Sequence, residues 1–139
     1  MTAPFFVDTN ILVYADDRHD SRKQEVSQEL LHSALTGRNA HLSTQVLSEF
    51  FQVAVKKLGL PAASVRRRVE IYSALNVFQP TVDDLLAAID LFRLHSLSFW
   101  DALIIRAAQA SGCRILYSED LQHGRRYDGL EIVNPFEGR

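Results

Sequence analysis

Short apolar segments alternate along this chain with longer segments of helical periodicity, and this alternation restricts its fold more than any other feature. The candidate strands are Phe5–Val7, Ala40–Ser43, Val77–Gln79, Arg114–Tyr117 and Glu131–Val133. The candidate helices are Asn10–Asp16, Asp20–Thr36, Thr44–Leu58, Pro61–Leu75, Thr81–His95 and Phe99–Ser111. Because the first strand is a continuous apolar run, we expect it to be buried on both faces. Short strands that alternate with helices predict an α/β fold, in which helices cover a parallel sheet.

Two of the candidate helices carry clear local signals. The first, Thr44–Leu58, has one apolar stripe, formed by Val46, Phe50, Val53 and Ala54. The second, Thr81–His95, begins with a capping box and continues with apolar residues at helical spacing, which are Val82, Leu85, Leu86, Ile89 and Phe92. The glycines at positions 37, 59 and 112 are expected to end the helices that precede them.

The composition predicts one globular domain that spans residues 1–139. The chain is 47% hydrophobic and 23% charged, and its net charge of −2 provides no global basic field for a polyanion. This balance argues against a constitutive nucleic-acid binder, but it allows an enzyme with a local basic rim. The single Cys113 excludes an intramolecular disulfide and a cysteine-based zinc site, so we expect a cytoplasmic location. We expect neither a signal peptide nor a membrane span.

The stretch FFVDTNILVYA, residues 5–15, places Asp8 inside an otherwise apolar run. A buried carboxylate costs several kcal/mol unless another group compensates its charge. The compensating group could be a helix N-terminus, a basic partner or a metal ion. Asp8 is therefore the first candidate for a functional residue.

Three further acidic residues are expected near Asp8. In a parallel α/β sheet, sites form outside the carboxyl ends of the strands, and both Asp8 and Asp120 follow a strand. Asp101 lies in the first turn of its helix, in the middle of an apolar stripe. Glu49 lies at the edge of the apolar stripe of its own helix. These positions suggest that the four side chains converge.

Each of these acids also has a simpler structural explanation. Asp8 could cap the helix that follows it, and Asp101 could form a capping box with Ser98. Glu49 could be a solvated residue at a helix edge, and Asp120 could be a turn residue. Only the combination of all four favours a site over these explanations.

Convergence of the four carboxylates would favour a bound divalent cation, because their like charges repel one another. Oxygen ligands without His or Cys indicate Mg²⁺ or Mn²⁺ rather than zinc. Mg²⁺ held by few carboxylates keeps several waters, which suits the activation of a water against a phosphodiester. The histidines are scattered without matching pairs, which gives little support to an acid–base mechanism that needs no metal.

Four segments together resemble the signature blocks of PIN-domain ribonucleases, and most closely those of the VapC toxins of bacterial type II toxin–antitoxin pairs. They are VDTNILVYA (7–15), TQVLSEF (44–50), FWDALI (99–104) and ILYSEDLQHG (115–124), and they occur in the family's order over nearly the whole chain. The resemblance implies a three-layer α/β/α sandwich around a short, mostly parallel sheet. It also implies a Mg²⁺-dependent endoribonuclease, in which Mn²⁺ can substitute.

Matched block by block, the resemblance implies four catalytic residues: Asp8, Glu49, Asp101 and Asp120. Asp8 and Asp101 match the usual metal ligands of the family. Glu119 is the alternative to Asp120, because only one of two adjacent carboxylates can point into the site. The resemblance also implies that the hydroxyl of Thr9, which follows Asp8, assists the site, and that Asn10 orders its loop.

The same resemblance implies an RNA substrate, a homodimer and a cognate antitoxin protein, with no membrane partner. The region 44–75 has wide apolar faces, and we expect the dimer or antitoxin contact there. RNA contact requires local positive charge. The candidate basic residues are Arg22, Lys23, Lys56, Lys57, Arg66–Arg68, Arg125 and Arg126, of which the last two follow the DLQHG block directly.

Two other functions remain open from the sequence. Haloacid-dehalogenase-like phosphotransferases also have an Asp at the end of the first strand, but they need a second Asp two residues later, where this chain has Asn10. A non-catalytic binding module on the same fold is the other alternative. The presence of all four acids argues against it.

Overall fold

The computed structural model describes residues 3–137, and a six-stranded sheet forms the centre of this part of the chain. The strands lie in the order β3-β2-β1-β4-β6-β5, and each neighbouring pair is parallel except the antiparallel pair β5–β6. Their bounds are β1 Phe5–Val7, β2 Ala40–Ser43, β3 Asn76–Phe78, β4 Ile115–Tyr117, β5 Arg126–Tyr127 and β6 Leu130–Val133.

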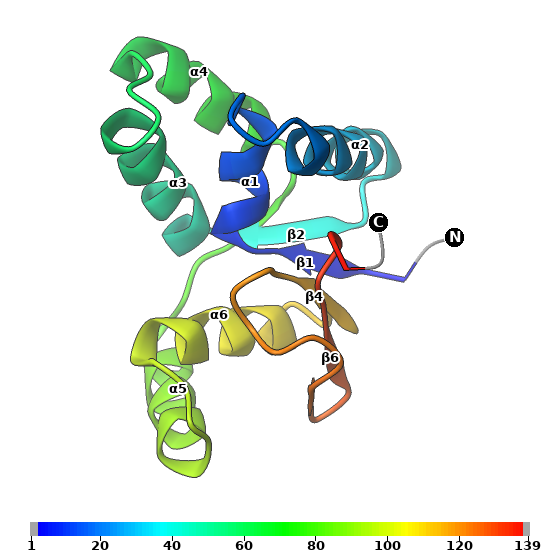
Figure 1. Cartoon of the computed structure of the whole chain (residues 1–139). Coiled ribbons are helices and arrows are strands. Elements are labelled where there is room, and N and C mark those ends of the chain that lie inside the picture. The colour runs from blue at the N-terminus through cyan, green and yellow to red at the C-terminus, as the bar shows by residue number, and fades with distance from the viewer. Residues whose placement is uncertain (1–2, 138–139) are drawn as a thin grey trace.

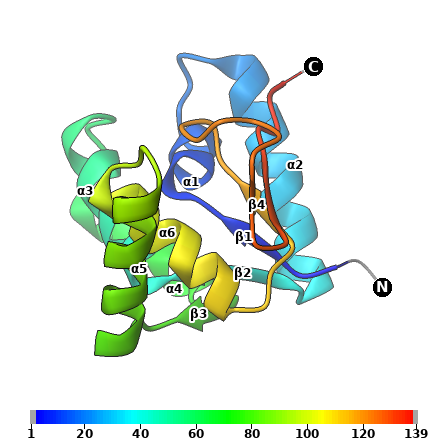
Figure 2. The same ribbon diagram turned by 90° about the horizontal axis from the view of Figure 1, so that it is seen from below.

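Helices cover both faces of this sheet. Figure 1 shows α1 to α4 on one face and α5 and α6 on the other, and Figure 2 shows α5 and α6 in front of the sheet. The helices are α1 Thr9–Ala15, α2 Ser21–Gly37, α3 Thr44–Lys56, α4 Ala62–Tyr72, α5 Val82–Leu94 and α6 Phe99–Ala110. The observed architecture is therefore the predicted three-layer α/β/α arrangement with a mostly parallel sheet.

The apolar run of β1 is explained by its central position. β1 pairs with β2 on one side and with β4 on the other, and all of its residues are buried. Phe6 and Val7 have no exposed surface, and they belong to one core cluster with Leu42, Phe50 and Leu116. A strand between two parallel neighbours and two helical layers has no polar face, so its sequence does not alternate.

Helix boundaries agree closely with their capping signals. Ser43 and Ser98 cap α3 and α6, and the predicted capping box of Thr81 and Asp84 is present at the start of α5. α2 ends one residue later than predicted. Gly37 is still helical, and it is the non-glycine residue Arg38 that adopts the left-handed conformation, with φ of 59°.

The apolar residues of α5 differ from the usual arrangement in which such a stripe faces the core. Only Asp84 and Ala88 of this helix are buried. The exposed fractions of Val82, Leu86 and Phe92 are 71%, 54% and 47%. α5 thus lies against α6 with Asp84, Ala88 and the partly buried Leu91 inward, and its other large apolar side chains are exposed. We call the exposed residues Val82, Leu85, Leu86, Ile89 and Phe92, which share one helix face, the α5 stripe.

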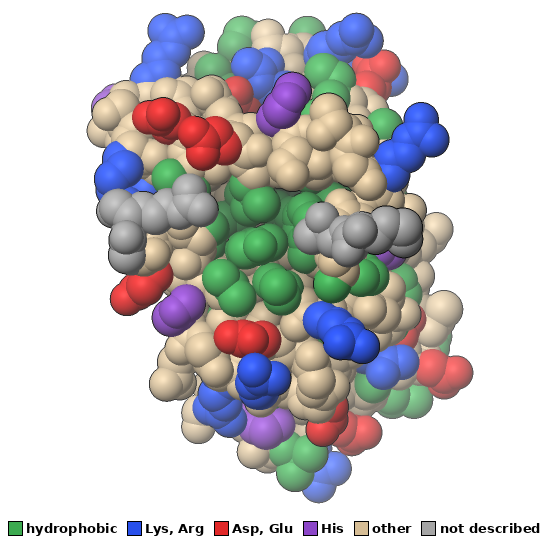
Figure 3. Space-filling model, turned by 90° about the vertical axis from the view of Figure 1, so that its right-hand side faces the viewer, with side chains coloured by type: hydrophobic (Ala, Val, Ile, Leu, Met, Phe, Trp, Pro, Cys, Tyr) green, Lys and Arg blue, Asp and Glu red, His purple; other side chains and the backbone are tan. Residues whose placement is uncertain are grey.

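Other surfaces are mixed in character. Figure 3 shows the face on which the two termini lie, where hydrophobic side chains gather at the centre and basic and acidic side chains are interspersed around them. This face therefore presents no uniform basic surface. No helix among residues 3–137 combines the length and apolar character that crossing a membrane requires.

Candidate active site

Asp8 lies where β1 ends and α1 begins, and its carboxylate is held on both oxygens. Oδ1 accepts a hydrogen bond of 2.7 Å from the backbone N–H of Thr9, and Oδ2 accepts one of 2.8 Å from the hydroxyl of Ser118. The side chain caps α1, as the simpler explanation predicted. Asp8 is only 5% exposed, so a cap alone does not account for a carboxylate placed this deep.

Asn10 connects the loop after β4 to the first turn of α1. Its Nδ2 donates to Oδ2 of Asp120 at 3.1 Å, with longer contacts of 3.4 Å to Asp8 Oδ2 and Ser118 Oγ. Its Oδ1 accepts from the backbone N–H of Glu119 at 3.2 Å. One amide thus holds Asp120 near Asp8, although the two residues belong to different strand ends.

Asp101 and Glu49 approach the same place from two helices. Asp101 lies in the first turn of α6, where its backbone N–H donates to the capping hydroxyl of Ser98 at 3.1 Å. Glu49 lies on α3, and its Oε1 accepts from Nε2 of Gln45 at 2.6 Å. Both side chains are partly exposed.

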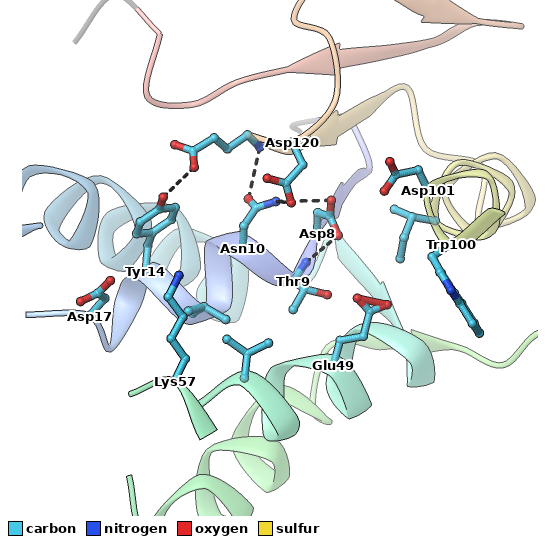
Figure 4. Close-up of a pocket in the computed structure, with 14 residues that line it drawn as sticks. Asp8, Thr9, Asn10, Tyr14, Asp17, Glu49, Lys57, Trp100, Asp101 and Asp120 are labelled. Atoms are coloured by element: carbon cyan, nitrogen blue, oxygen red, sulfur yellow. Dashed lines mark hydrogen bonds between the residues drawn. The ribbon is translucent and has the colours of Figure 1, made fainter. Parts of the chain in front are cut away.

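All four predicted acids line one cavity of about 270 Å³, shown in Figure 4. Val13, Val53 and Ile104 contribute apolar walls. The structure therefore brings together side chains from the ends of β1 and β4 and from α3 and α6. This is the carboxyl edge of the parallel strands, where sites of α/β sheets form.

The adjacent acids Glu119 and Asp120 have different partners. Glu119 also lines the cavity, but its Oε1 accepts from the hydroxyl of Tyr14 at 2.6 Å and its Oε2 pairs with Lys23. Asp120 instead bonds Asn10 beside Asp8. The charge of Glu119 is thus compensated by a cation of the chain, whereas no ion pair of Asp120 occurs within residues 3–137.

Burial, with a smaller contribution from neighbouring acids, raises the pKa of two of these carboxyl groups. Burial raises the pKa of Asp8 to about 7, and the charges of Asp120 and Glu49 add to this rise, while the hydrogen bonds from Ser118 and Thr9 oppose it. Burial, with a contribution from Asp120, also raises the pKa of Asp101, against the hydrogen bond of Ser98. Six acidic side chains and one lysine line this cavity, so acidic groups predominate there.

The donor set of this cavity suits a hard divalent cation. No group of three His, Cys, Asp or Glu residues in the described part of the chain is arranged to hold a metal ion. Mg²⁺, however, is commonly held by only one or two carboxylates together with waters and substrate phosphates. In addition, Oγ1 of Thr9 is buried beside Asp8 without a hydrogen-bond partner among residues 3–137. Carboxylate oxygens and an unpartnered hydroxyl fit Mg²⁺ or Mn²⁺.

Most basic residues that the sequence suggested for RNA contact are engaged elsewhere. Lys23 pairs with Glu119, Arg66 with Glu70, Arg68 with Asp16 and Arg126 with Glu131. Arg125 contacts the ring of His95 and lies over Tyr127. Of the candidate basic residues within the described chain, Lys57 alone lines the cavity.

Sequence reasoning missed two residues of the site. Ser118 is fully buried and bonds Asp8, and Tyr14 bonds Glu119. Ser118 follows β4 directly, as Asp8 follows β1, so the strand-end position was the available signal. Nothing in the spacing of Tyr14 distinguishes it from a core aromatic residue.

The sequence matches the family model of the PIN domain over residues 5–129, a range that includes all four acids of the cavity. The chain belongs to the PIN-domain family. This match confirms the family that the four sequence segments suggested. No curated protein matches the sequence at a significant level.

Solved structures share the fold of this PIN domain at low sequence identity. VapC20 of Mycobacterium tuberculosis, described as a toxin that cleaves the sarcin-ricin loop, is 21% identical with a TM-score of 0.67, over 82% of this chain and 88% of that one. A toxin–antitoxin complex from Klebsiella pneumoniae gives 20% and 0.69, over 96% and 98% of the two chains. DNA-bound VapBC from Salmonella typhimurium gives 17% and 0.68, over 96% and 99%.

Proposed function

We propose that this PIN domain is a divalent-metal-dependent endoribonuclease that acts as the toxin of a toxin–antitoxin pair. The observation that carries the proposal is the common cavity of Asp8, Glu49, Asp101 and Asp120, which come from four separate elements. Membership of the PIN-domain family and the likeness to VapC20, which is described as a toxin that cleaves the sarcin-ricin loop, support the choice of RNA as substrate.

In this proposal Asp8 and Asp101 hold the cation, which is Mg²⁺ or its substitute Mn²⁺. The bound ion would neutralise charge on the scissile phosphate and lower the pKa of a water. The hydrogen bonds from Thr9 and Ser118 fix the orientation of both Asp8 oxygens, so that this ligand needs no rearrangement. Because its pKa is raised to about 7, Asp8 carries a proton in part of the population at neutral pH, and a bound cation would displace that proton.

Glu49 and Asp120 complete the acidic lining on opposite sides of Asp8. Asn10 keeps Asp120 directed at Asp8, and Gln45 holds Glu49 against α3. Preorganised groups of this kind lower the barrier because they do not reorient during the reaction. We assign Asp120, rather than Glu119, as the fourth catalytic acid.

The direct test is cleavage of end-labelled RNA by purified protein in Mg²⁺, in Mn²⁺ and in excess EDTA. We expect cleavage with either metal, none in EDTA, and products with 5′-phosphate and 3′-hydroxyl ends. Asp101→Asn should lower the rate at least about 100-fold, because it removes a metal ligand. Asp83→Asn is the matched control, since Asp83 is an exposed acid in the first turn of α5. Absence of cleavage with every metal, or full activity of Asp101→Asn, would contradict the proposal.

The toxin role is supported by relatives that were solved as toxin–antitoxin complexes. We propose a cytoplasmic protein with a cognate antitoxin, which blocks the cavity until it is removed. Expression of the chain alone should then arrest bacterial growth. The Asp101→Asn variant, expressed to the same level, should not. Equal arrest by both proteins would show that any toxicity is independent of the site.

We also propose that the protein forms a homodimer. The α5 stripe supports this, because an isologous interface pairs the same apolar patch on two copies. This differs from the region 44–75 that the sequence suggested, in which Phe51 and Ile71 are the large hydrophobic residues left exposed.

A further inference from the structure

Trp100 is the only tryptophan of the chain, and it is unusually exposed for so large an apolar side chain. Its exposed fraction is 64%, yet it lines the cavity of the four acids and is the immediate neighbour of Asp101. Tryptophan is highly buried on average in folded proteins. An exposed indole at the rim of a candidate active site therefore calls for an explanation.

The structure holds this indole in place rather than leaving it on a mobile segment. Trp100 lies in the first turn of α6, behind the cap formed by Ser98. The ring of Phe99 packs edge-on against it, with centroids 5.5 Å apart and an interplanar angle of 65°. Its backbone carbonyl accepts a contact of 3.4 Å from Nε2 of Gln45 on α3. The ring is thus presented at the cavity from a fixed backbone.

The other side of the cavity offers a positive charge. Lys57, the C-terminal cap of α3, lines the cavity and is exposed, and it forms no ion pair within residues 3–137. Figure 4 shows Trp100 and Lys57 on opposite sides of the acidic side chains. The lining of the cavity also includes the apolar side chains of Val53 and Ile104. An aromatic plane, an acidic centre and a free ammonium group therefore border one hollow.

We propose that Trp100 is a stacking platform for one unpaired base of the substrate, next to the phosphate that the acids address, while Lys57 binds a neighbouring phosphate. This inference rests on the proposed ribonuclease function and assigns a substrate-binding role to two residues outside the acidic cluster. Aromatic side chains bind single-stranded nucleic acid by stacking on the faces of its bases, with little sequence preference. A base inside a duplex has no free face to offer. Stacking on Trp100 therefore requires that the base next to the scissile phosphate be unpaired.

The first test measures binding by the fluorescence of Trp100, which has no background from other tryptophans. The probe is a short oligoribonucleotide of mixed sequence, titrated into the Asp8→Asn variant with Mg²⁺ so that it is not cleaved. We expect saturable quenching by the single strand and much weaker quenching by the same strand in a duplex. No quenching, or equal quenching by both forms, would overturn the proposal.

The second test separates stacking from a structural role through two substitutions of the same residue. Trp100→Leu keeps an apolar side chain but removes the aromatic plane, and we expect it to raise KM for single-stranded RNA about 10-fold, with a small change in kcat. Trp100→Phe keeps a plane and should rescue most of the effect. Phe51→Leu is the matched control, because Phe51 is an exposed aromatic residue of α3 outside both the cavity and the α5 stripe. Unchanged KM in Trp100→Leu, or equal losses in both Trp100 variants, would overturn the proposal.

The same experiments also test the alternative that Trp100 contacts a protein partner rather than RNA. If Trp100→Leu changes the oligomeric mass or antitoxin binding and leaves the RNA titration unchanged, the indole belongs to a protein interface and the proposal is wrong. Failure of the proposed function is a separate result, because the unsubstituted protein would then cleave no RNA at all. The fluorescence titration would still decide whether Trp100 binds single strands.

Discussion

Asp8 combines two properties that oppose each other at the scale of a single residue. It is almost fully buried, which favours the neutral carboxyl group, and it accepts hydrogen bonds from Thr9 and Ser118, which favour the carboxylate. Burial prevails and raises the pKa to about 7. A buried carboxylate of this kind destabilises the metal-free protein, but it is well suited to bind a cation.

This predicts a particular pH dependence of stability in EDTA. The pKa of an unfolded Asp is about 3.9, so between that value and about 7 the native state binds more protons at Asp8 than the unfolded state does. The free energy of unfolding should therefore fall as pH rises through this range. Asp8→Asn removes this dependence and should be more stable than the unsubstituted protein above pH 7, by at most about 4 kcal/mol.

Denaturant unfolding at pH 5 and at pH 8 measures this effect. We expect the advantage of Asp8→Asn to be larger at pH 8, and addition of Mg²⁺ to reduce it by stabilising the unsubstituted protein. Asp17→Asn is a useful control, because Asp17 also lines the cavity but its carboxylate bonds His19 rather than the acids. An equal advantage of Asp8→Asn at both pH values would contradict the prediction.

The two neighbouring acids after β4 give a second prediction at this scale. Asp120→Asn should lower cleavage about 10- to 100-fold, because it alters a group aimed at the reacting centre. Glu119→Gln should leave cleavage within about threefold. It should instead lower the free energy of unfolding by about 1–2 kcal/mol, since it breaks the half-buried pair with Lys23. The reverse pattern in cleavage assays and thermal melts would assign Glu119 to the site.

Two of the four acids could be named from the sequence because their positions are unusual for surface carboxylates, whereas Glu49 and Asp120 were added by their expected convergence and by the family resemblance. Asp8 interrupts an apolar strand, and Asp101 lies within an apolar helix stripe. Their partners could not be named in this way. Ser118 and Tyr14 are residue types that occur everywhere, and only the pairing of β1 with β4 brings them to Asp8 and to Glu119. Sequence alone also left the choice between Glu119 and Asp120 open.

At the scale of the elements, helices and buried strands were predictable because caps and apolar runs are local signals. The capping box of α5 and the continuous apolar run of β1 are both confirmed. The missed strand β5 has two residues and no apolar run. Its signal was the dipeptide Asp128-Gly129, where both residues adopt positive φ and reverse the chain into β6.

The attachment of α5 to α6 gives a prediction for an element rather than for the site. α5 is joined to α6 by the hydrogen-bonded ion pair between Arg106 Nε and Asp84 Oδ1 at 2.9 Å, in which Asp84 is buried. Arg106→Met should lower the free energy of unfolding by about 2 kcal/mol, because it leaves the buried carboxylate of Asp84 without its cationic partner. Chemical denaturation checks this value.

Arg126→Met is the matched control for that substitution. Arg126 pairs with Glu131 at 3.3 Å, but both side chains are well exposed, so its loss should cost less than about 1 kcal/mol. If the two substitutions have equal effects, the Arg106–Asp84 pair does not anchor α5.

At the scale of the whole molecule, the exposed apolar surface favours association. The proposed homodimer can be tested by placing a charge in each of the two candidate interfaces and comparing the results. Leu86 lies in the α5 stripe and is 54% exposed, whereas Ile71 lies on α4, in the region that the sequence suggested, and is 44% exposed. A charge at the centre of an apolar interface is left buried and unpaired, which costs several kcal/mol. Leu86→Asp should therefore convert the dimer into a monomer in sedimentation velocity, while Ile71→Asp leaves it intact. Since neither side chain is buried in the single chain, both variants should keep their fold, as circular dichroism can verify. Dissociation by Ile71→Asp alone would move the interface to the region 44–75, and a monomeric unsubstituted protein would remove the dimer from the proposal.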